Sequence, residues 1–212
     1  YWVALALVGQ GTAFVAALLL ASTILLGVEA RLAKTDAVIT ATVVACMGVL
    51  ARYWLGNPEK SGWRLPAIFW TAIGVGLLVK GPITPMVPAL TILGLFAFTR
   101  SFAWLRGLRP VVGLLWTLVL VAPWFILIMV ATKGAFLADS LGQDMLGKVA
   151  QGQEAHGAPP GAYLATFWAI GWPMAPLALL ALFYPLLLWL SGLAGGGIPA
   201  LGFLPSLIAL TL

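Results

Sequence analysis

The segment of residues 65–99 is the feature that most constrains the fold of this chain. It is almost wholly apolar and carries one charged side chain, Lys80, which Gly81 and Pro82 follow directly. A helix needs about 20 apolar residues to cross a bilayer, and apolar stretches recur along the chain. With 62% hydrophobic and 8% charged residues, the composition is unlike that of soluble domains. The sequence therefore predicts an all-α fold, a polytopic bundle of transmembrane helices.

Apolar runs separated by helix breakers predict about seven helices. Their expected bounds are 2–27, 36–54, 65–80, 82–99, 111–131, 161–190 and 198–212. The chain begins at Tyr1 and ends at Leu212 within apolar runs, so we expect residues 1–212 to be an internal fragment of one membrane domain. The only cysteine, Cys46, lies in an apolar helix, where we expect it to pack as a small side chain.

Charged residues gather in loops that alternate along the chain. Loops 52–64 and 100–109 hold one acid, Glu59, and six cations: Arg52, Lys60, Arg64, Arg100, Arg106 and Arg109. The positive-inside rule assigns both loops to the cytoplasm, so the chain between them crosses the membrane and returns at Lys80. Segments 28–36 and 132–160 then lie outside. With Lys80 counted, these outer segments hold five cations and five acids, so their net charge is zero. The net charge of +5 is therefore a topology signal and predicts no nucleic-acid partner.

Lys80 is costly in this position, because insertion of a lysine at membrane depth costs roughly 2.5–3.5 kcal/mol. Residues 65–79 give about 22 Å of helix, short of a hydrocarbon core of about 30 Å, so Lys80 is expected just below the outer interface. One explanation is a helix-end lysine that snorkels to the interface. Snorkelling requires neither the Gly81-Pro82 break nor the short helix. We favour an anion site, with phosphate as the expected ligand, since the helix after Pro82 offers its positive end.

The charged turn 29–36 and the loop 132–160 supply the other candidates. Thr35 or Asp36 is expected to cap the helix that begins near Ala37, and Asp36 gains a functional role only if Lys80 opens on the same side. His156, the only histidine, is a candidate acid, base, phosphate donor or metal ligand, although a lone loop histidine is more often solvated. A protein-only zinc site is not expected. A carboxylate-bound divalent cation stays open.

Four motifs in order resemble one enzyme family. They are Arg31-(x)4-Asp36, Leu78-Val-Lys80-Gly81-Pro82, Pro123-Trp124 and His156-Gly-Ala-Pro-Pro-Gly-Ala-Tyr163. Together they resemble the membrane glycosyltransferases of the GT-C fold, in particular the bacterial dolichyl-phosphate-mannose–protein mannosyltransferase-like and aminoarabinose (lipid A) transferase-like enzymes. The resemblance extends over essentially the whole chain.

The resemblance implies transfer of a sugar from a polyprenyl-phosphate donor to a lipid or protein acceptor at the outer face of the bacterial inner membrane. Lys80 matches the lysine that contacts the lipid-linked phosphate. Asp36 matches an acidic residue beside the active-site cavity, with an assisting or acceptor-positioning role, and His156 matches a loop position over the donor site. Candidate substrate-binding residues are therefore Lys80, His156, Arg31, Lys34 and Tyr163. The principal catalytic aspartate of the family is expected before Tyr1, and no cofactor is implied with certainty.

Two other functions fit the same residues. A transporter or flippase would use Lys80 to bind an anionic, phosphate-bearing substrate, but transporters usually show internal repeats and midplane charges on several helices. Another lipid-phosphate enzyme, such as an O-antigen ligase, would also carry basic outer loops. The sequence favours the glycosyltransferase over both.

Overall fold

The computed structural model describes residues 1–32, 34–56, 62–138, 162–178 and 183, and this part of the chain contains helices and turns but no β-strand. Its helical elements include η1 (Ala4–Ala6), α1 (Gln10–Ala21), α2 (Ile24–Arg31), α3 (Thr35–Leu55), α4 (Arg64–Lys80), α5 (Ile83–Thr99), η3 (Ala103–Leu108), α6 (Pro110–Ala131), α7 (Ala135–Ala138) and α9 (Ala162–Ile170). The predicted all-α class is thus confirmed for these residues.

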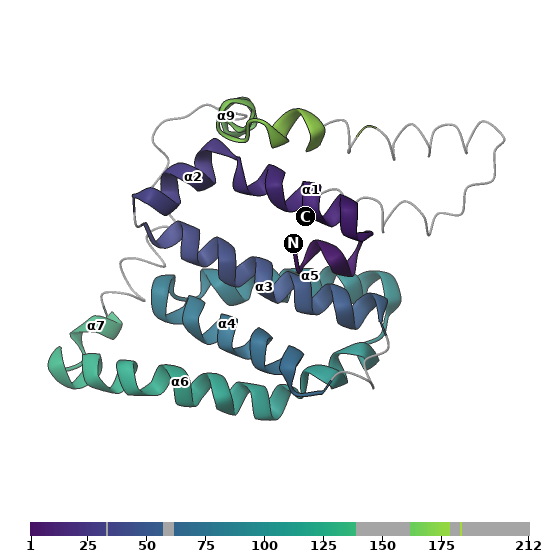
Figure 1. The fold of residues 1–212 in the computed structure, drawn as a ribbon. Coiled ribbons are helices and arrows are strands. Elements are labelled where there is room, and N and C mark those ends of the chain that lie inside the picture. Colours follow the sequence, from purple (N-terminus) through teal and green to yellow (C-terminus); the bar gives the residue numbers. More distant parts are fainter. Residues whose placement is uncertain (33, 57–61, 139–161, 179–182, 184–212) are drawn as a thin grey trace.

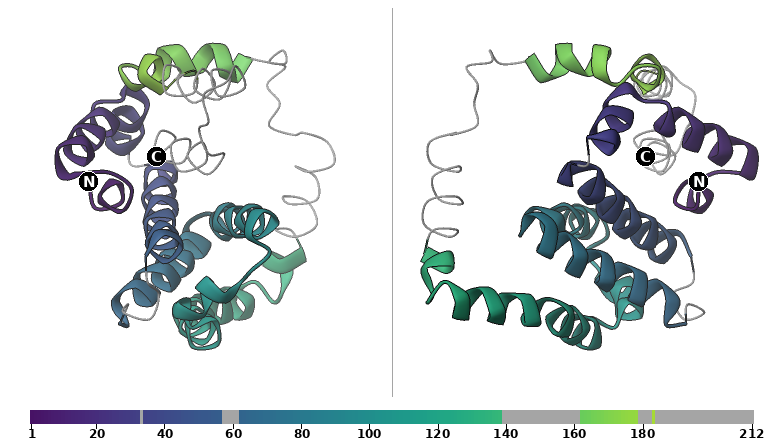
Figure 2. Two further views of the ribbon diagram at one scale, coloured as in Figure 1. Left: turned by 90° about the vertical axis from the view of Figure 1, so that its right-hand side faces the viewer. Right: turned by 60° about the vertical axis from the view of Figure 1, so that its left-hand side comes forward.

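Helix α4 is the centre of the bundle (Figure 1). It packs against α3 on one side and α6 on the other, and α5 contacts both α4 and α3. Consecutive helices α3, α4, α5 and α6 run alternately in opposite directions (Figures 1 and 2). Short connections between long helices favour this up-and-down arrangement.

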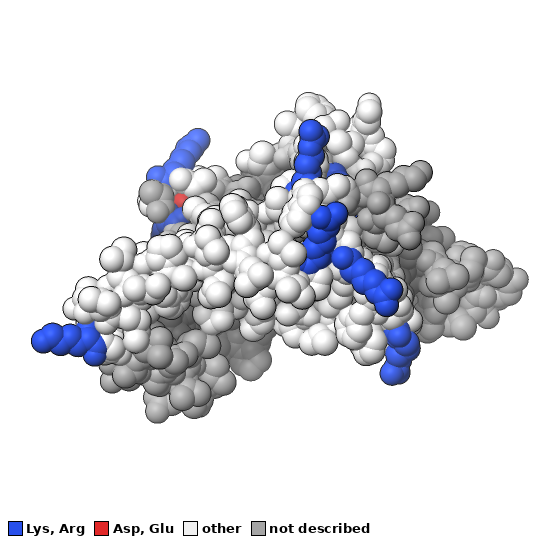
Figure 3. Space-filling view, turned by 90° about the horizontal axis from the view of Figure 1, so that it is seen from below, with Lys and Arg blue, Asp and Glu red and all other residues white. Residues whose placement is uncertain are grey.

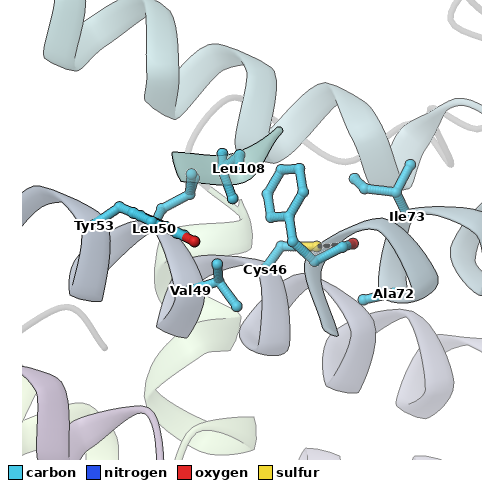
Figure 4. Packing of buried hydrophobic residues seen from close by; sticks show 8 residues of the cluster. Cys46, Val49, Leu50, Tyr53, Ala72, Ile73 and Leu108 are labelled. Atoms are coloured by element: carbon cyan, nitrogen blue, oxygen red, sulfur yellow. Dashed lines mark hydrogen bonds between the residues drawn. The ribbon is translucent and has the colours of Figure 1, made fainter. Parts of the chain in front are cut away.

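The core lies where α3, α4 and η3 meet (Figure 4). It consists of Cys46, Val49, Leu50, Tyr53, Phe69, Ala72, Ile73 and Leu108. Cys46 is fully buried and its thiol lies 3.8 Å from the carbonyl oxygen of Phe69. The prediction that this cysteine packs as a small side chain is confirmed.

Close contacts join α4 to η3 and to α6 without any charged group. The indole of Trp70 donates a hydrogen bond to the carbonyl oxygen of Leu108 at 2.8 Å. The hydroxyl of Thr117 donates a hydrogen bond to the backbone carbonyl oxygen of Trp70 at 3.1 Å. Trp70 lies directly on Gly113, where a Cβ atom would come within 1.8 Å of the indole nitrogen. Small residues allow such close approach in membrane bundles, where no hydrophobic force drives helices together.

Within the described residues, two helices are long and apolar enough to cross a membrane, α3 and α6, and a third span results if the bent pair of α1 and α2 is counted as one. The outer face of α6 carries apolar residues that are 66–75% exposed: Val119, Leu127 and Val130. Exposed apolar side chains of this kind are what lipid contact requires. The seven spans expected from the sequence are not all represented, because α4 and α5 have 17 residues each and 198–212 lies outside the described residues.

Two predicted helices are broken, and here the sequence-based bounds were wrong. The expected helix 2–27 divides into η1, α1 and α2, and α1 and α2 meet at an angle of 59°. At the bend, the Thr23 hydroxyl bonds to the carbonyl oxygen of Leu20, and the Ile24 amide bonds to that of Trp172. The expected helix 161–190 is also interrupted, by a turn at residues 171–173. Hydropathy reports neither interruption, because both segments are largely apolar.

The predicted break between the two helices around Lys80 is confirmed, because α4 ends at Lys80 and α5 begins at Ile83. The two basic loops also meet at one end of the bundle, as expected. The Tyr53 hydroxyl donates to the carbonyl oxygen of Gly107 at 2.9 Å, and the Arg109 guanidinium lies 4.4 Å from the Trp63 ring. In Figure 3 Lys and Arg side chains gather toward this end and also lie at the opposite end, and the surface between the two ends is largely uncharged.

The contact between α4 and α6 predicts how a single methyl group affects stability. Gly113→Ala should lower the free energy of unfolding by about 1–3 kcal/mol, because the added Cβ atom overlaps the Trp70 indole. Gly94→Ala is the matched control, since nothing lies within 4 Å of its Cβ position and alanine favours a helix. Thermal unfolding of both variants in one detergent measures the effect. Equal stability of the two variants would contradict the packing.

Candidate functional site

Lys80 is the last residue of α4, at the end of the bundle opposite to the basic loops. A cation at this position is favoured by the partial negative charge of a helix C-terminus. Its side chain is 45% exposed, so the ammonium group is accessible and is not buried in the packed interior. The helix end therefore places the Lys80 side chain partly at the surface of the bundle.

The turn after Lys80 depends on two glycines. Gly81 has a φ of +71°, which side-chain-bearing residues rarely adopt, and its amide bonds to the carbonyl oxygen of Leu77 at 3.0 Å. Gly76 lets the first turn of α5 come close to α4, because a Cβ atom there would lie 2.2 Å from the Thr84 methyl group. Tight packing of α5 on α4 thus fixes the direction in which Lys80 leaves its helix.

Asp36 lies in the first turn of α3 and contacts Lys80 directly. The lysine ammonium nitrogen is 2.5 Å from Oδ1 of Asp36, and the two side chains are 45% and 51% exposed. The prediction that Thr35 or Asp36 caps the helix was wrong: the N-cap position is Lys34, and no side chain caps it. The Asp36 carboxylate pairs with the cation on α4 instead, and so the condition for a functional role, that Lys80 opens on the same side, is met.

Two further cations stand before this pair in the sequence, Arg31 at the end of α2 and Lys34 at the N-cap of α3. The Lys34 ammonium group bonds to Oε1 of Glu29 at 2.9 Å, and Lys34 is itself half exposed. Arg31 ends α2, and among the described residues it forms no salt bridge. The structure therefore arranges three predicted site residues and Glu29 in two ion pairs, Glu29 with Lys34 and Asp36 with Lys80.

Glu29 is the residue that sequence reasoning did not select. Its Oε1 atom accepts from Lys34, whereas its Oε2 atom is buried and has no hydrogen-bond partner among the described residues. The sequence held one signal for it, a lysine five positions later across an expected turn. Glu29 and Lys34 come into contact because α2 ends between them, at Arg31. The expected helix 2–27 did not place a helix end there.

The other candidates are not tested by the structure. His156 lies outside the described residues, and Tyr163 belongs to α9, where the orientation of its side chain is not described. Within the described part of the chain, no three His, Cys, Asp or Glu side chains form a group that could hold a metal ion. The roles of His156 and Tyr163 and of a divalent cation remain predictions.

An apolar groove runs between α3 and α4 below the ion pair. On α3 it begins at Val38, two positions after Asp36, and on α4 it begins at Val75, five positions before Lys80. The remaining lining residues are small or aliphatic: Ala41, Thr42, Ala45, Ala67, Ile68, Thr71 and Ala72. The two threonine hydroxyls already have partners, Ile39 and Trp116. The groove thus offers an apolar surface next to a charged end.

A known protein family matches much of this chain. The model of the dolichyl-phosphate-mannose-protein mannosyltransferase family matches residues 1–127, more than half of the 212 residues. The chain belongs to this family. Searches of curated proteins and of solved structures found no match.

Members of the dolichyl-phosphate-mannose-protein mannosyltransferase family are glycosyltransferases that use dolichyl- or polyprenyl-phosphate sugar donors. The chain is accordingly a membrane glycosyltransferase, and the resemblance found in its sequence is confirmed. The match includes Arg31, Lys34, Asp36 and Lys80, and it ends before His156 and Tyr163.

The geometry of the turn predicts a large effect of a small substitution. Gly81→Ala should cost roughly 1–3 kcal/mol of stability, because alanine at a φ of +71° with this ψ is strained. Relief of that strain would redirect Lys80, so the rate of sugar transfer should fall as well. Gly62→Ala, at an exposed position with open space around its Cβ, is the control. The turn would be misassigned if Gly81→Ala retained both the stability and the rate of the control.

Proposed function

We propose that this glycosyltransferase moves a sugar from a polyprenyl-phosphate donor to a lipid or protein acceptor at the outer face of the bacterial inner membrane, with Lys80 as the phosphate-binding residue. The observation that carries the proposal is a half-exposed lysine at the end of an apolar helix, paired with a carboxylate. Lys80 is a compact cation, suited to hold the phosphate that leaves the sugar.

In the proposed reaction the bond between the anomeric carbon and the phosphate oxygen breaks, and its electron pair goes to the phosphate. An acceptor oxygen or nitrogen forms the new bond to the anomeric carbon and gives up its proton to a carboxylate base. Lys80 stabilises the charge that develops on the departing phosphate. A cation already in position needs no reorganisation during the reaction.

Asp36 is proposed to assist by orienting the acceptor. Its carboxylate lies on the helix next to Lys80, within 2.5 Å of the ammonium group, so it adjoins the position that the phosphate would take. A carboxylate there can accept a hydrogen bond from an acceptor hydroxyl or amine. Arg31, Lys34, His156 and Tyr163 are proposed as further contacts to the substrates.

The apolar groove between α3 and α4 supports a lipid donor. It adjoins the Lys80 end and continues along both helices with aliphatic and small side chains. A donor whose phosphate binds Lys80 would have its prenyl chain beside this surface, in contact with the apolar interior of the membrane. A water-soluble sugar donor would have no use for such a surface.

Charge distribution supports the outer location. The end of the bundle away from Lys80 carries five arginines, and the described residues there include no acid. These arginines are Arg52, Arg64, Arg100, Arg106 and Arg109. The positive-inside rule assigns the basic end to the cytoplasm. Lys80, Asp36 and the segment 132–160 are then proposed to face the periplasm.

Removal of the Lys80 charge tests the proposed function. In the purified protein, Lys80→Gln should reduce transfer from a polyprenyl-phosphate sugar by at least about 100-fold, because loss of one stabilising donor for the leaving oxyanion typically costs that much. Arg64→Gln, at the other end of the same helix, should keep the wild-type rate. Transfer is followed with a radiolabelled donor. A Lys80→Gln variant with the wild-type rate would refute the phosphate role.

A further inference from the structure

The Lys80–Asp36 pair joins the end of α4 to the first turn of α3. Asp36 is thus bound to the same ammonium group that the proposed function assigns to the donor phosphate. Both side chains are about half exposed, so neither is locked in place by surrounding protein. The ion pair can open without disturbing the buried core, which lies further along α3 and α4.

A phosphate cannot join this pair without a conflict of charge. With Asp36 still on Lys80, two anions would share one cation, and like charges at contact distance repel strongly. The nearby Lys34 does not relieve this conflict, because Glu29 already holds its ammonium group at 2.9 Å. Among the described residues at this end, the cations without a carboxylate partner are Arg31, which ends α2, and Lys133, which follows α6.

We propose that the donor phosphate displaces Asp36 from Lys80, so that Asp36 becomes free to contact the acceptor only when the donor is bound. This inference rests on the proposed function of Lys80 and adds an order of events to it. Before the donor binds, Lys80 engages Oδ1 of the carboxylate, which weakens Asp36 as a hydrogen-bond acceptor for an incoming hydroxyl or amine. After it binds, the phosphate takes the place of the carboxylate and the acceptor site is completed.

The same exchange assists release of the product. The donor phosphate is a diester with one negative charge, whereas the product is a monoester with about −1.5 to −2 at neutral pH. Lys80 therefore attracts the product more strongly than the donor. Return of Asp36 to Lys80 competes with the retained phosphate and so accelerates its departure.

Affinity for polyprenyl phosphate, measured by titration of the purified protein in nanodiscs, tests this exchange. Asp36→Asn should bind the lipid phosphate about two- to fivefold more tightly than wild type, because an exposed ion pair no longer competes for Lys80. Asp36→Glu keeps the competing charge and should bind close to wild type. Asp36→Ser serves as a second test should the asparagine variant be unstable in thermal unfolding.

Lys80→Gln, alone and combined with Asp36→Asn, separates this inference from the proposed function. We expect Lys80→Gln to weaken binding about tenfold or more, and Asp36→Asn to have no further effect in that background. If Lys80→Gln binds like wild type, the phosphate role itself fails. Two results would overturn only the exchange, provided that Lys80→Gln weakens binding. In the first, Asp36→Asn alone does not tighten binding. In the second, Asp36→Asn tightens binding as much in the Lys80→Gln background as in the wild-type protein.

Discussion

The packing of α3 against α4 is the interaction on which the candidate site depends. Cys46 of α3 contacts Phe69 of α4 in the core; Asp36 lies ten residues before the first and Lys80 eleven after the second. The helices are antiparallel and each residue adds about 1.5 Å along the helix axis. One register of α4 against α3 therefore brings together Cys46 with Phe69 and Asp36 with Lys80. The apolar core and the ion pair are therefore two consequences of one alignment. A shift of α4 by a single turn would separate Lys80 from Asp36.

Much of this arrangement could be predicted from the sequence, because it follows from hydropathy and charge alone. The break at Gly81-Pro82, the shared end of the two basic loops and the packing role of Cys46 all follow from where charges and helix breakers interrupt apolar runs. These signals are local or statistical. They do not depend on which helix faces which.

The errors in the sequence-based account concern contacts that depend on where helices end and on which helices meet. A residue near the start of a helix is expected to cap it, yet Asp36 gives its carboxylate to Lys80, 44 residues away. The bend at Thr23 is fixed in part by a hydrogen bond from Ile24 to Trp172, which no local pattern indicates. Glu29 went unselected because its partner Lys34 comes into reach only once α2 ends at Arg31.

A half-exposed ion pair at the end of an apolar bundle suits an enzyme that must bind and release an anion. Exposed pairs of this kind contribute little to stability, so an incoming anion can replace one partner at small cost. A deeply buried pair would resist that exchange. The structure of the purified protein with bound polyprenyl phosphate is the most direct test. The account predicts phosphate density at the Lys80 ammonium group with Asp36 turned away from it, and phosphate elsewhere with the Lys80–Asp36 pair intact would contradict it.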